Sequence, residues 1–297
     1  MSSIRQLPKK VADALSGVPS EAPYPRFVID DVLDQAEYER LLLSFPDDLV
    51  GDPDENRFVN YTILPGAEIP DRLSHEWREF ITTLRSPTVV NELVEKISTS
   101  VLHRYPAWWR WILYFRVRNP KNYRINLAFS ANYAGRYLPP HNDNSYKVLA
   151  LVLYFAPSGY SGPDEGTLFF RPKTRNSLVE ALKRFNRFSD SRLTRYTPIS
   201  LLPMCSAYIY NGTQSEEERR NSEDWFYSNF ENDFNVAFFQ NRIAGFVKTQ
   251  NSFHAVDMRE STYVGPRRSL LINLNLKHSV AARAWQSFRT RVLKLSS

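Results

Sequence analysis

Residues 133–155 read YAGRYLPPHNDNSYKVLALVLYF, and the order of elements in this stretch decides the fold class. The first part, residues 133–138, predicts a strand end that breaks at a glycine turn. The last part, residues 147–155, predicts a buried strand because it is short, apolar and partly β-branched. The loop between them carries His141 and Asp143. A polar loop between two strands can present both side chains to one ligand.

His141 and Asp143 alone are weak evidence for a metal, because a turn rich in Pro and Asn also recruits Asp for backbone hydrogen bonds. His254 strengthens the case, since it opens an apolar strand and can supply a second imidazole. Two imidazoles and one carboxylate on one face of an octahedral metal leave three positions free, which is the arrangement of non-heme Fe(II) oxygen chemistry. The alternative for His254 is a core histidine with satisfied hydrogen bonds. Surface or core positions are the simpler interpretation of the other histidines, His75, His103 and His278.

Residues 265–274, GPRRSLLINL, predict a strand that opens with two arginines in an otherwise apolar run. Strand side chains alternate between faces, so Arg267 and Ser269 share one face, which is mixed. Arg268 lies on the other face, which is apolar. A buried arginine needs an anion, and its planar guanidinium suits a carboxylate in bidentate geometry. Arg267 and Ser269 therefore predict a carboxylate receptor, and the alternative is an exposed arginine pair on an edge strand.

With these motifs in order, the sequence resembles the Fe(II)- and 2-oxoglutarate-dependent dioxygenase superfamily, in its prolyl-hydroxylase-like branch, over roughly residues 124–276. The motifs that carry the resemblance are Tyr133-x-Gly135, His141-x-Asp143, the strand to Tyr154, Gly166-Thr167-Leu168-Phe169-Phe170, Asn251-x-x-His254-x-Val256 and Arg267-x-Ser269.

The resemblance implies a role for each site residue. His141, Asp143 and His254 would hold Fe(II) as the catalytic centre. Arg267 and Ser269 would bind the distal carboxylate of 2-oxoglutarate, with Arg268 as the alternative if the strand register differs by one residue. Tyr133 and Tyr154 would line the pocket for this co-substrate, and O2 would be the second co-substrate.

Three positions refine the resemblance. Prolyl hydroxylases proper usually bind the co-substrate carboxylate with lysine, so Arg267 indicates the superfamily rather than prolyl hydroxylation. The carboxylate of Asp143 argues against the related halogenases, in which a small residue replaces it. Hydroxylation is therefore the default reaction. Residues 164–167, DEGT, stand where the family pattern has a double glycine before the fourth core strand.

The expected fold class is α+β, with a double-stranded β-helix (a jelly-roll or cupin-like core) buttressed by N-terminal helices. We expect residues 1–115 to form an α/β buttress and residues 116–280 the catalytic core, with a helical insertion at about 172–235. Residues 281–297 predict a C-terminal basic helix. Long inserted segments near active sites often act as lids or binding loops, so we expect substrate selection to reside in the insertion.

The N-terminal part predicts a small α/β layer. Residues 25–30 predict a strand, and residues 34–44 predict a helix with Asp34 as its N-cap. Ser86 and Pro87 predict the start of a second helix with a first-turn proline. We also expect a strand at residues 112–117, preceded by tryptophans that pack in the core, namely Trp108, Trp109 and Trp111.

Composition narrows the class of protein. The 297 residues are 42% hydrophobic and 24% charged, as in a globular protein that can bury a large core. The single cysteine, Cys205, cannot form an intramolecular disulfide, and its apolar neighbours indicate a buried residue rather than a nucleophile. No apolar run is long enough to span a bilayer and no signal-peptide apolar region is found, so a cytoplasmic protein is expected. The net charge of +6 is too modest to indicate nucleic-acid binding.

The basic segment at residues 171–196 has an amphipathic helical pattern, with its apolar side formed by Leu178, Val179, Leu182 and Phe185. Its charges either form a solvated face or recognise an anionic substrate.

The sequence thus predicts an enzyme, an Fe(II)/2-oxoglutarate-dependent oxygenase that hydroxylates an unactivated C–H bond of a small substrate, with anionic molecules as candidates, and releases succinate and CO2. A protein or peptide hydroxylase is the alternative within this class. A non-catalytic β-barrel that binds a ligand is the alternative from another class. The sequence leaves open the substrate, its stereochemistry, the oligomeric state and a diversion to desaturation, cyclisation or epimerisation.

Overall fold

The computed structural model describes residues 3–18, 23–50, 60–103, 107–144, 146–185, 206–210 and 214–277. The N-terminal part consists of η1 (Ser3–Gln6), α1 (Leu7–Ser16), β1 (Arg26–Ile29), α2 (Gln35–Leu43), α3 (Asp47–Val50), β2 (Asn60–Ile63), α4 (His75–Leu84), α5 (Pro87–His103), α6 (Ala107–Arg118) and η2 (Pro120–Asn122). It is followed by β3 (Tyr123–Asn132), β4 (Tyr137–His141), β5 (Lys147–Tyr154), β6 (Ser161–Pro172), α7 (Arg175–Arg184), α9 (Glu216–Asn229), β7 (Phe230–Phe239), β8 (Ile243–Val247), β9 (His254–Asp257) and β10 (Arg267–Leu276).

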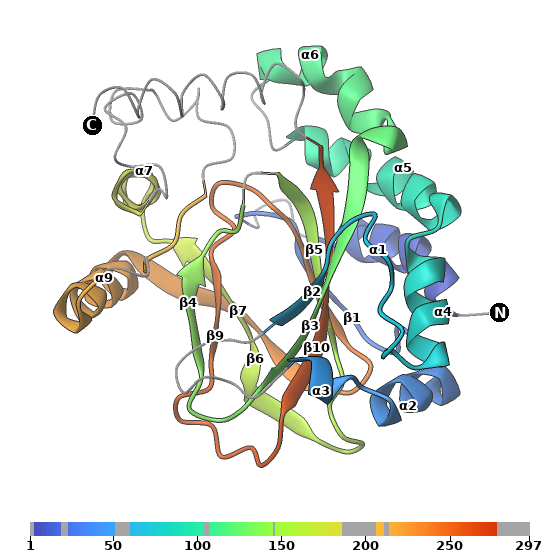
Figure 1. The fold of residues 1–297 in the computed structure, drawn as a ribbon. Helices are drawn as coiled ribbons and strands as arrows, with labels where there is room; N and C mark the ends of the chain where they lie inside the picture. Colours follow the sequence, from blue (N-terminus) through green and yellow to red (C-terminus); the bar gives the residue numbers. More distant parts are fainter. Residues whose placement is uncertain are drawn as a thin grey trace, which may run out of the picture.

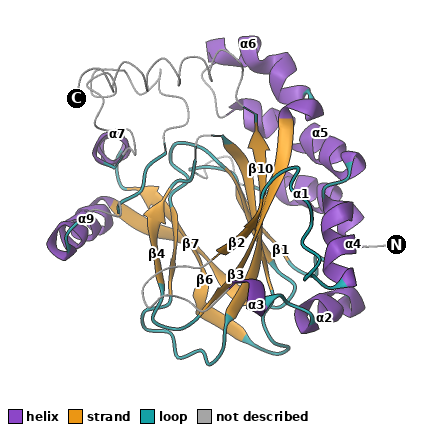
Figure 2. Cartoon of the chain, viewed as in Figure 1, coloured by secondary structure: helices purple, strands orange, loops and turns teal. Residues whose placement is uncertain are grey.

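The strands form two antiparallel sheets, which together with the helices make an α+β fold, as expected. The larger sheet has the order β1-β8-β5-β10-β3-β2, and the smaller sheet has the order β4-β9-β6-β7. Helices α1, α2, α4 and α5 lie along the outer side of the larger sheet, while α7 and α9 lie beside the smaller sheet (Figures 1 and 2). From β3 to β10 the chain passes back and forth between the two sheets, so residues far apart in sequence meet in the space between them.

The main core lies between the larger sheet and the N-terminal helices. Strand β10 contributes Leu270, Ile272 and Leu274, which are at most 1% exposed and belong to the same apolar cluster as residues of α1, α4 and α5. Trp77 of α4 is fully buried in this cluster, and its ring centroid lies 4.7 Å from that of Phe129 on β3. Its indole Nε1 donates a hydrogen bond to the main-chain oxygen of Leu41 at 3.1 Å, which connects α4 to α2. The helices therefore support the outer face of the sheet whose inner face carries Arg267 and Ser269.

Several expected elements are present. The strand expected at 25–30 is β1, the helix expected at 34–44 is α2, and α5 begins at Pro87. Strand β7 begins at Phe230, inside the range expected for the insertion, because Phe230 pairs with Pro172 at the end of β6. Cys205 and residues 281–297 lie outside the described residues. Among the described helices, none is long and apolar enough to cross a membrane.

The strand expected at residues 112–117 is wrong, because these residues belong to helix α6. Aromatic and β-branched residues favoured a strand, but β3 already pairs with β10 along its whole length. The helical spacing also places Arg118 over the ring of Tyr114 at 4.5 Å, a favourable contact between residues i and i+4. The expected core position of Trp111 is also wrong, since this side chain is 83% exposed. The side chains of Trp108 and Trp109 lie outside the described part.

The contrast between two tryptophans gives a stability test. Trp77→Ala removes a buried ring and a buried hydrogen bond, so we expect it to lower the free energy of unfolding by about 3–5 kcal/mol. Trp111→Ala removes an exposed ring, and we expect a change within about 0.5 kcal/mol. Urea unfolding followed by circular dichroism measures both. A loss of stability in Trp111→Ala equal to that in Trp77→Ala would contradict this description of the core.

Candidate metal centre

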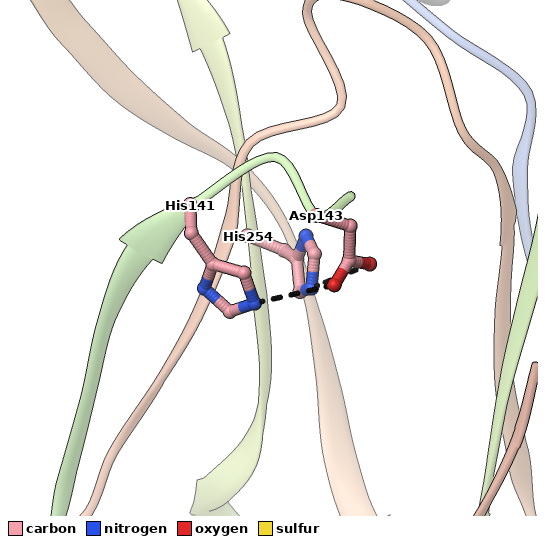
Figure 3. Close-up of side chains that lie close together, drawn as sticks. All are labelled: His141, Asp143 and His254. Carbon is pink, nitrogen blue, oxygen red and sulfur yellow. Dashed lines mark ion pairs between the residues drawn. The ribbon is translucent and has the colours of Figure 1, made fainter. Parts of the chain in front are cut away.

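Three side chains from two parts of the chain converge between the sheets. His141 is the last residue of β4, His254 is the first residue of β9, and the two are paired directly in the antiparallel register. Asp143 follows β4 by two residues and has φ of 65°, a left-handed conformation that Asp tolerates better than most residues. One donor atom from each of the three side chains lies within 4.8 Å of the others. Figure 3 shows the two imidazoles and the carboxylate facing a common point.

Hydrogen bonds fix which imidazole nitrogen faces this point. Nδ1 of His141 lies 2.9 Å from the main-chain oxygen of Pro139, and Nδ1 of His254 lies 3.0 Å from that of Ser252. Because a carbonyl oxygen only accepts, each Nδ1 must carry the proton and donate it. In the neutral imidazoles, both Nε2 atoms therefore present a lone pair to the centre of the site. This is the orientation that metal-binding histidines adopt.

The carboxylate of Asp143 divides its two oxygens between different partners. Oδ1 accepts a hydrogen bond from Nζ of Lys147 at 2.8 Å, whereas Oδ2 is buried without a hydrogen-bond partner among the described residues. Burial would raise the pKa of Asp143, but the Lys147 ammonium and the two histidines outweigh burial and lower it below its usual range. Asp143 is therefore ionised at neutral pH and has an oxygen left for another cation.

The protonation states of the three groups indicate which kind of ligand fits between them. Burial lowers the pKa of His141, and burial together with His141 lowers that of His254 to about 3, so both imidazoles are neutral at pH 7. Each Nε2 nevertheless lies 3.6 Å from a carboxylate oxygen with no proton between them. Ligands at right angles on a metal with bonds of roughly 2.1 Å lie about 3 Å apart, close to this spacing. Three converging lone pairs without a proton fit a divalent metal cation.

A second part of the site is built around Arg267 at the start of β10. The side chain is 2% exposed, and no acidic side chain in the described part forms an ion pair with it. Its Nε donates to the main-chain oxygen of Glu165, its Nη1 lies 3.5 Å from Oγ of Ser269, and its Nη2 is buried without a partner in the part of the chain that the structure describes. Burial lowers the pKa of Arg267, but a guanidinium stays charged at neutral pH. A buried cation with a free donor suits an anionic ligand.

Tyr154 connects the arginine to the opposite sheet. The guanidinium carbon of Arg267 lies 5.0 Å from the centre of the Tyr154 ring, and the Tyr154 hydroxyl forms a 2.5 Å hydrogen bond with Oγ1 of Thr167. Thr167 lies two residues before Phe169 on β6, and Phe169 pairs with His254. Two residues of a strand span about 7 Å. The arginine group and the three converging side chains are thus separate but lie within reach of one small ligand.

Arg268 and Tyr133, the other two residues expected to bind the co-substrate, do not point into this site. Arg268 points to the outer face of the sheet, where its Nε and Nη2 bind the two carboxylate oxygens of Asp47 at 2.9 and 2.6 Å. The Tyr133 side chain is 44% exposed at the turn between β3 and β4. The Gly135 of this turn has φ of 83° and donates its N–H to the oxygen of Met258, so the turn requires glycine for its backbone conformation.

Asn142 is a site residue that the sequence analysis missed. It is fully buried between the two predicted ligands, and its Oδ1 accepts a 2.7 Å hydrogen bond from the main-chain N–H of Ala207. Its Nδ2 donates to the oxygen of Gln250 at 2.8 Å. These bonds hold the loop of His141 and Asp143 against the segment 206–210 and against the chain that leads into β9. An asparagine in a loop rich in Pro and Asn resembles an ordinary turn residue, so the sequence carried no signal for this role.

The segment 206–210 also supplies a wall of the site. The ring of Tyr208 stacks on the imidazole of His141 with a centroid distance of 5.2 Å and an interplanar angle of 12°. On the other side, Phe246 lies 4.5 Å from the ring of His254 and Phe169 lies 6.3 Å from it. Aromatic rings thus surround both imidazoles and limit the access of water to the converging side chains.

No protein-family model and no curated protein matches the sequence. Among solved structures, a prolyl-4-hydroxylase of Pseudomonas putida is 9% identical, with 90% of this chain and 99% of that chain covered at a TM-score of 0.45. A structure of the prolyl 4-hydroxylases from Phytophthora capsici is 13% identical, with 97% and 75% covered at 0.45. The non-heme α-ketoglutarate-dependent epimerase SnoN from nogalamycin biosynthesis is 13% identical, with 91% and 80% covered at 0.41. All three lie below a TM-score of 0.5, so the side chains of this chain must carry any functional conclusion.

The hydrogen bonds of Asn142 predict a role in positioning the metal ligands. Asn142→Ala removes the side-chain hydrogen bonds from the loop to its two neighbours and leaves the main-chain hydrogen bond of Asn142 to Ala207, so we expect affinity for Co(II) to fall 10–100-fold. Titration with Co(II), followed by the visible absorption of the bound ion, measures affinity and coordination together. The matched control is Asn144→Ala on the same loop, where only a hydrogen bond to the Tyr146 hydroxyl is lost. Wild-type affinity and spectrum in folded Asn142→Ala would exclude this role.

Proposed function

We propose that the protein is a non-heme Fe(II)- and 2-oxoglutarate-dependent oxygenase that hydroxylates a C–H bond of a small substrate. The observation that carries the proposal is the convergence of two neutral imidazole nitrogens and one carboxylate oxygen with no proton between them. Two histidines and one carboxylate are the ligand set of non-heme Fe(II) oxygenases, and this set leaves open positions on the metal. The buried guanidinium of Arg267, whose Nη2 has no hydrogen-bond partner among the described residues, supplies the second half of such a site.

The strand order supports a double-stranded β-helix as the scaffold. β3, β5, β8 and β10 belong to the larger sheet, while β4, β6, β7 and β9 belong to the smaller sheet. A jelly roll of eight strands distributes its chain between two sheets in this way. Strands β1 and β2 then extend the larger sheet at its two edges.

In the proposed site, Nε2 of His141, Nε2 of His254 and one carboxylate oxygen of Asp143 hold the metal. Lys147 binds the other carboxylate oxygen, which orients the Asp143 side chain and leaves one oxygen for the metal. Bound Fe(II), together with 2-oxoglutarate and O2, supplies the oxidising power that converts a C–H bond to an alcohol with release of succinate and CO2. Tyr208, Phe169 and Phe246 exclude water from the imidazoles, and the protein's own contribution is binding and orientation.

Arg267 binds the distal carboxylate of 2-oxoglutarate in this proposal. Within the described ranges, Nη2 lacks a partner, Nη1 faces the Ser269 hydroxyl and no acidic side chain pairs with the guanidinium, so a carboxylate can bind to both groups. The Tyr154 ring lies against the guanidinium and fixes its plane. Arg268 is already paired with Asp47 on the outer face, which favours Arg267 as the receptor.

An anaerobic absorbance titration with Fe(II) and then 2-oxoglutarate tests both halves of the site without a substrate. We expect the wild type to give a visible charge-transfer band of the iron and keto-acid complex, and His254→Ala to give none. Arg267→Gln should need at least tenfold more 2-oxoglutarate, because it loses a charge-assisted hydrogen bond, which contributes about 1.5–3 kcal/mol.

Arg268→Gln is the matched control, since it removes the neighbouring arginine from the opposite face. It should need no more 2-oxoglutarate than the wild type, because a half-exposed ion pair contributes about 0–1 kcal/mol to stability and nothing to the inner face. The absence of a band in folded, iron-loaded wild-type protein would exclude the oxygenase. It would favour the alternative of a non-catalytic β-barrel that binds a ligand.

A further inference from the structure

The inner face of the larger sheet changes its chemistry in layers along β3, β10 and β5. Arg267 pairs with Asn132, and Ser269 pairs with Ser130 on β3 and Tyr154 on β5, which makes one polar end. Leu271 follows, between Ala128 and Val152, as an apolar layer. Beyond this layer the face becomes polar again with three asparagines from two adjacent strands, Asn126, Asn273 and Asn275. The proposed co-substrate site uses the first polar end and leaves the second without a role.

This second polar group, the amide layer of Asn126, Asn273 and Asn275, contains acceptors that lack partners. Oδ1 of Asn126 and Oδ1 of Asn275 are both buried without a hydrogen bond among the described residues. A buried amide oxygen without a partner costs about 1–3 kcal/mol, and native proteins keep few such groups. Asn126 and Asn275 as whole residues are half-buried, although their Oδ1 atoms are covered. A ligand can therefore approach part of each residue, and a ligand that satisfies the two oxygens must bring hydrogen-bond donors.

The amide layer lies beside the metal centre rather than beside Arg267. Asn275 is directly opposite Lys147 in the register of β10 and β5, and Nζ of Lys147 binds the metal-facing carboxylate of Asp143. Asn273 is opposite Ala150, which pairs on its other side with Phe246, the residue in contact with His254. A molecule bound to the amide layer would thus lie next to the three converging side chains.

We propose that the amide layer of Asn126, Asn273 and Asn275 binds the substrate, and that this substrate is a small molecule with several hydroxyl groups, such as a sugar or a sugar acid. This inference rests on the proposed function, because it gives the hydroxylated molecule a place beside the metal. Each amide offers an acceptor and a pair of donors, and a hydroxyl group is the simplest partner that both donates and accepts. Neighbouring amides on paired strands match neighbouring hydroxyls on one molecule.

The charges around the layer exclude an amine as the preferred partner. None of the residues in register on the inner face of β3, β10 and β5 is acidic, and the layer adjoins Lys147. Asp143 is already paired with Lys147, so an ammonium group would have no free carboxylate among the residues in register and would meet Arg124, which lies opposite Asn275. A neutral or acidic molecule with hydroxyl groups meets no such repulsion.

Ligand-detected saturation-transfer NMR tests this with the full chain loaded with Zn(II) and 2-oxoglutarate. One arm uses the neutral compounds glucose, galactose, mannose and myo-inositol, and a second uses glucuronate and gluconate. The comparison compounds are glucosamine and cyclohexanecarboxylate, which respectively add a positive charge and remove the hydroxyls. We expect signals from at least one hydroxyl-rich arm and weaker signals from both comparison compounds.

Asn126→Leu and Asn275→Leu then test the residues. Each is expected to weaken binding of the responding compound about tenfold, the order of one or two hydrogen bonds. Each should keep or slightly raise the melting temperature, because leucine removes an acceptor that has no partner in the free protein. The matched control is Asn91→Leu on the exposed side of α5, which should change neither binding nor melting temperature.

Three results would overturn the inference: no signal from either hydroxyl-rich arm, an equal signal from cyclohexanecarboxylate, or wild-type binding in both asparagine variants. A clear fall in melting temperature in Asn126→Leu would also overturn it, since it would assign the amide to the free protein's own hydrogen bonding. The charge-transfer band of the Fe(II) and 2-oxoglutarate complex shows whether the substrate class alone is wrong or the proposed function as well. If the band forms in the wild type and in both variants, the oxygenase stands and only the substrate class is wrong.

Discussion

The structure depends on the register of β10, which hydrogen-bonds to β3 on one side and to β5 on the other. Its outer face, with Leu270, Ile272 and Leu274, completes the main core against the helices, while its inner face carries Arg267 and Ser269. A shift of one residue would exchange the two faces. The apolar side chains would then leave the core, and the polar side chains of Ser269 and Asn273 would enter it. Hydrophobic burial and the cost of burying polar groups therefore favour the same register.

This register explains why much of the site could be predicted from sequence. Alternation along residues 267–274 placed Arg267 and Arg268 on opposite faces, and the structure has them there. The convergence of His141, Asp143 and His254 could also be predicted, because the donor types restrict the chemistry. The contacts of Asn142 and Lys147 could not be predicted, because asparagine and lysine are common in loops without any functional role. Asn142 binds main-chain groups of two distant segments, and Lys147 binds Asp143 only because of the conformation of the loop between them.

The errors at residues 107–118 have a different physical origin. Aromatic residues suit a half-buried strand, but this preference describes packing against neighbours rather than the backbone itself. Here β10 occupies one edge of β3 and β2 pairs with the other edge at residues 127–130, and the segment forms a helix that exposes Trp111 and Phe115. Tyr133 illustrates the same limit, because a tyrosine beside a glycine turn can point into a site or toward solvent. Position along the chain predicts the turn but not the direction of the side chain.

The net charge of the site restricts the charge of the ligands that can bind there together. Before any ligand binds, Asp143 and Lys147 neutralise each other, both imidazoles are neutral, and Arg267 alone is unpaired among these groups. A divalent metal adds two positive charges in a buried place, where uncompensated charge is costly. In the proposed function, a dicarboxylate that binds both the metal and Arg267 would remove two of the three positive charges. The remaining positive charge would disfavour a cationic substrate, and the amide oxygens of Asn126 and Asn275, which have no partner among the described residues, require hydrogen-bond donors. Hydroxyl groups meet both conditions at once.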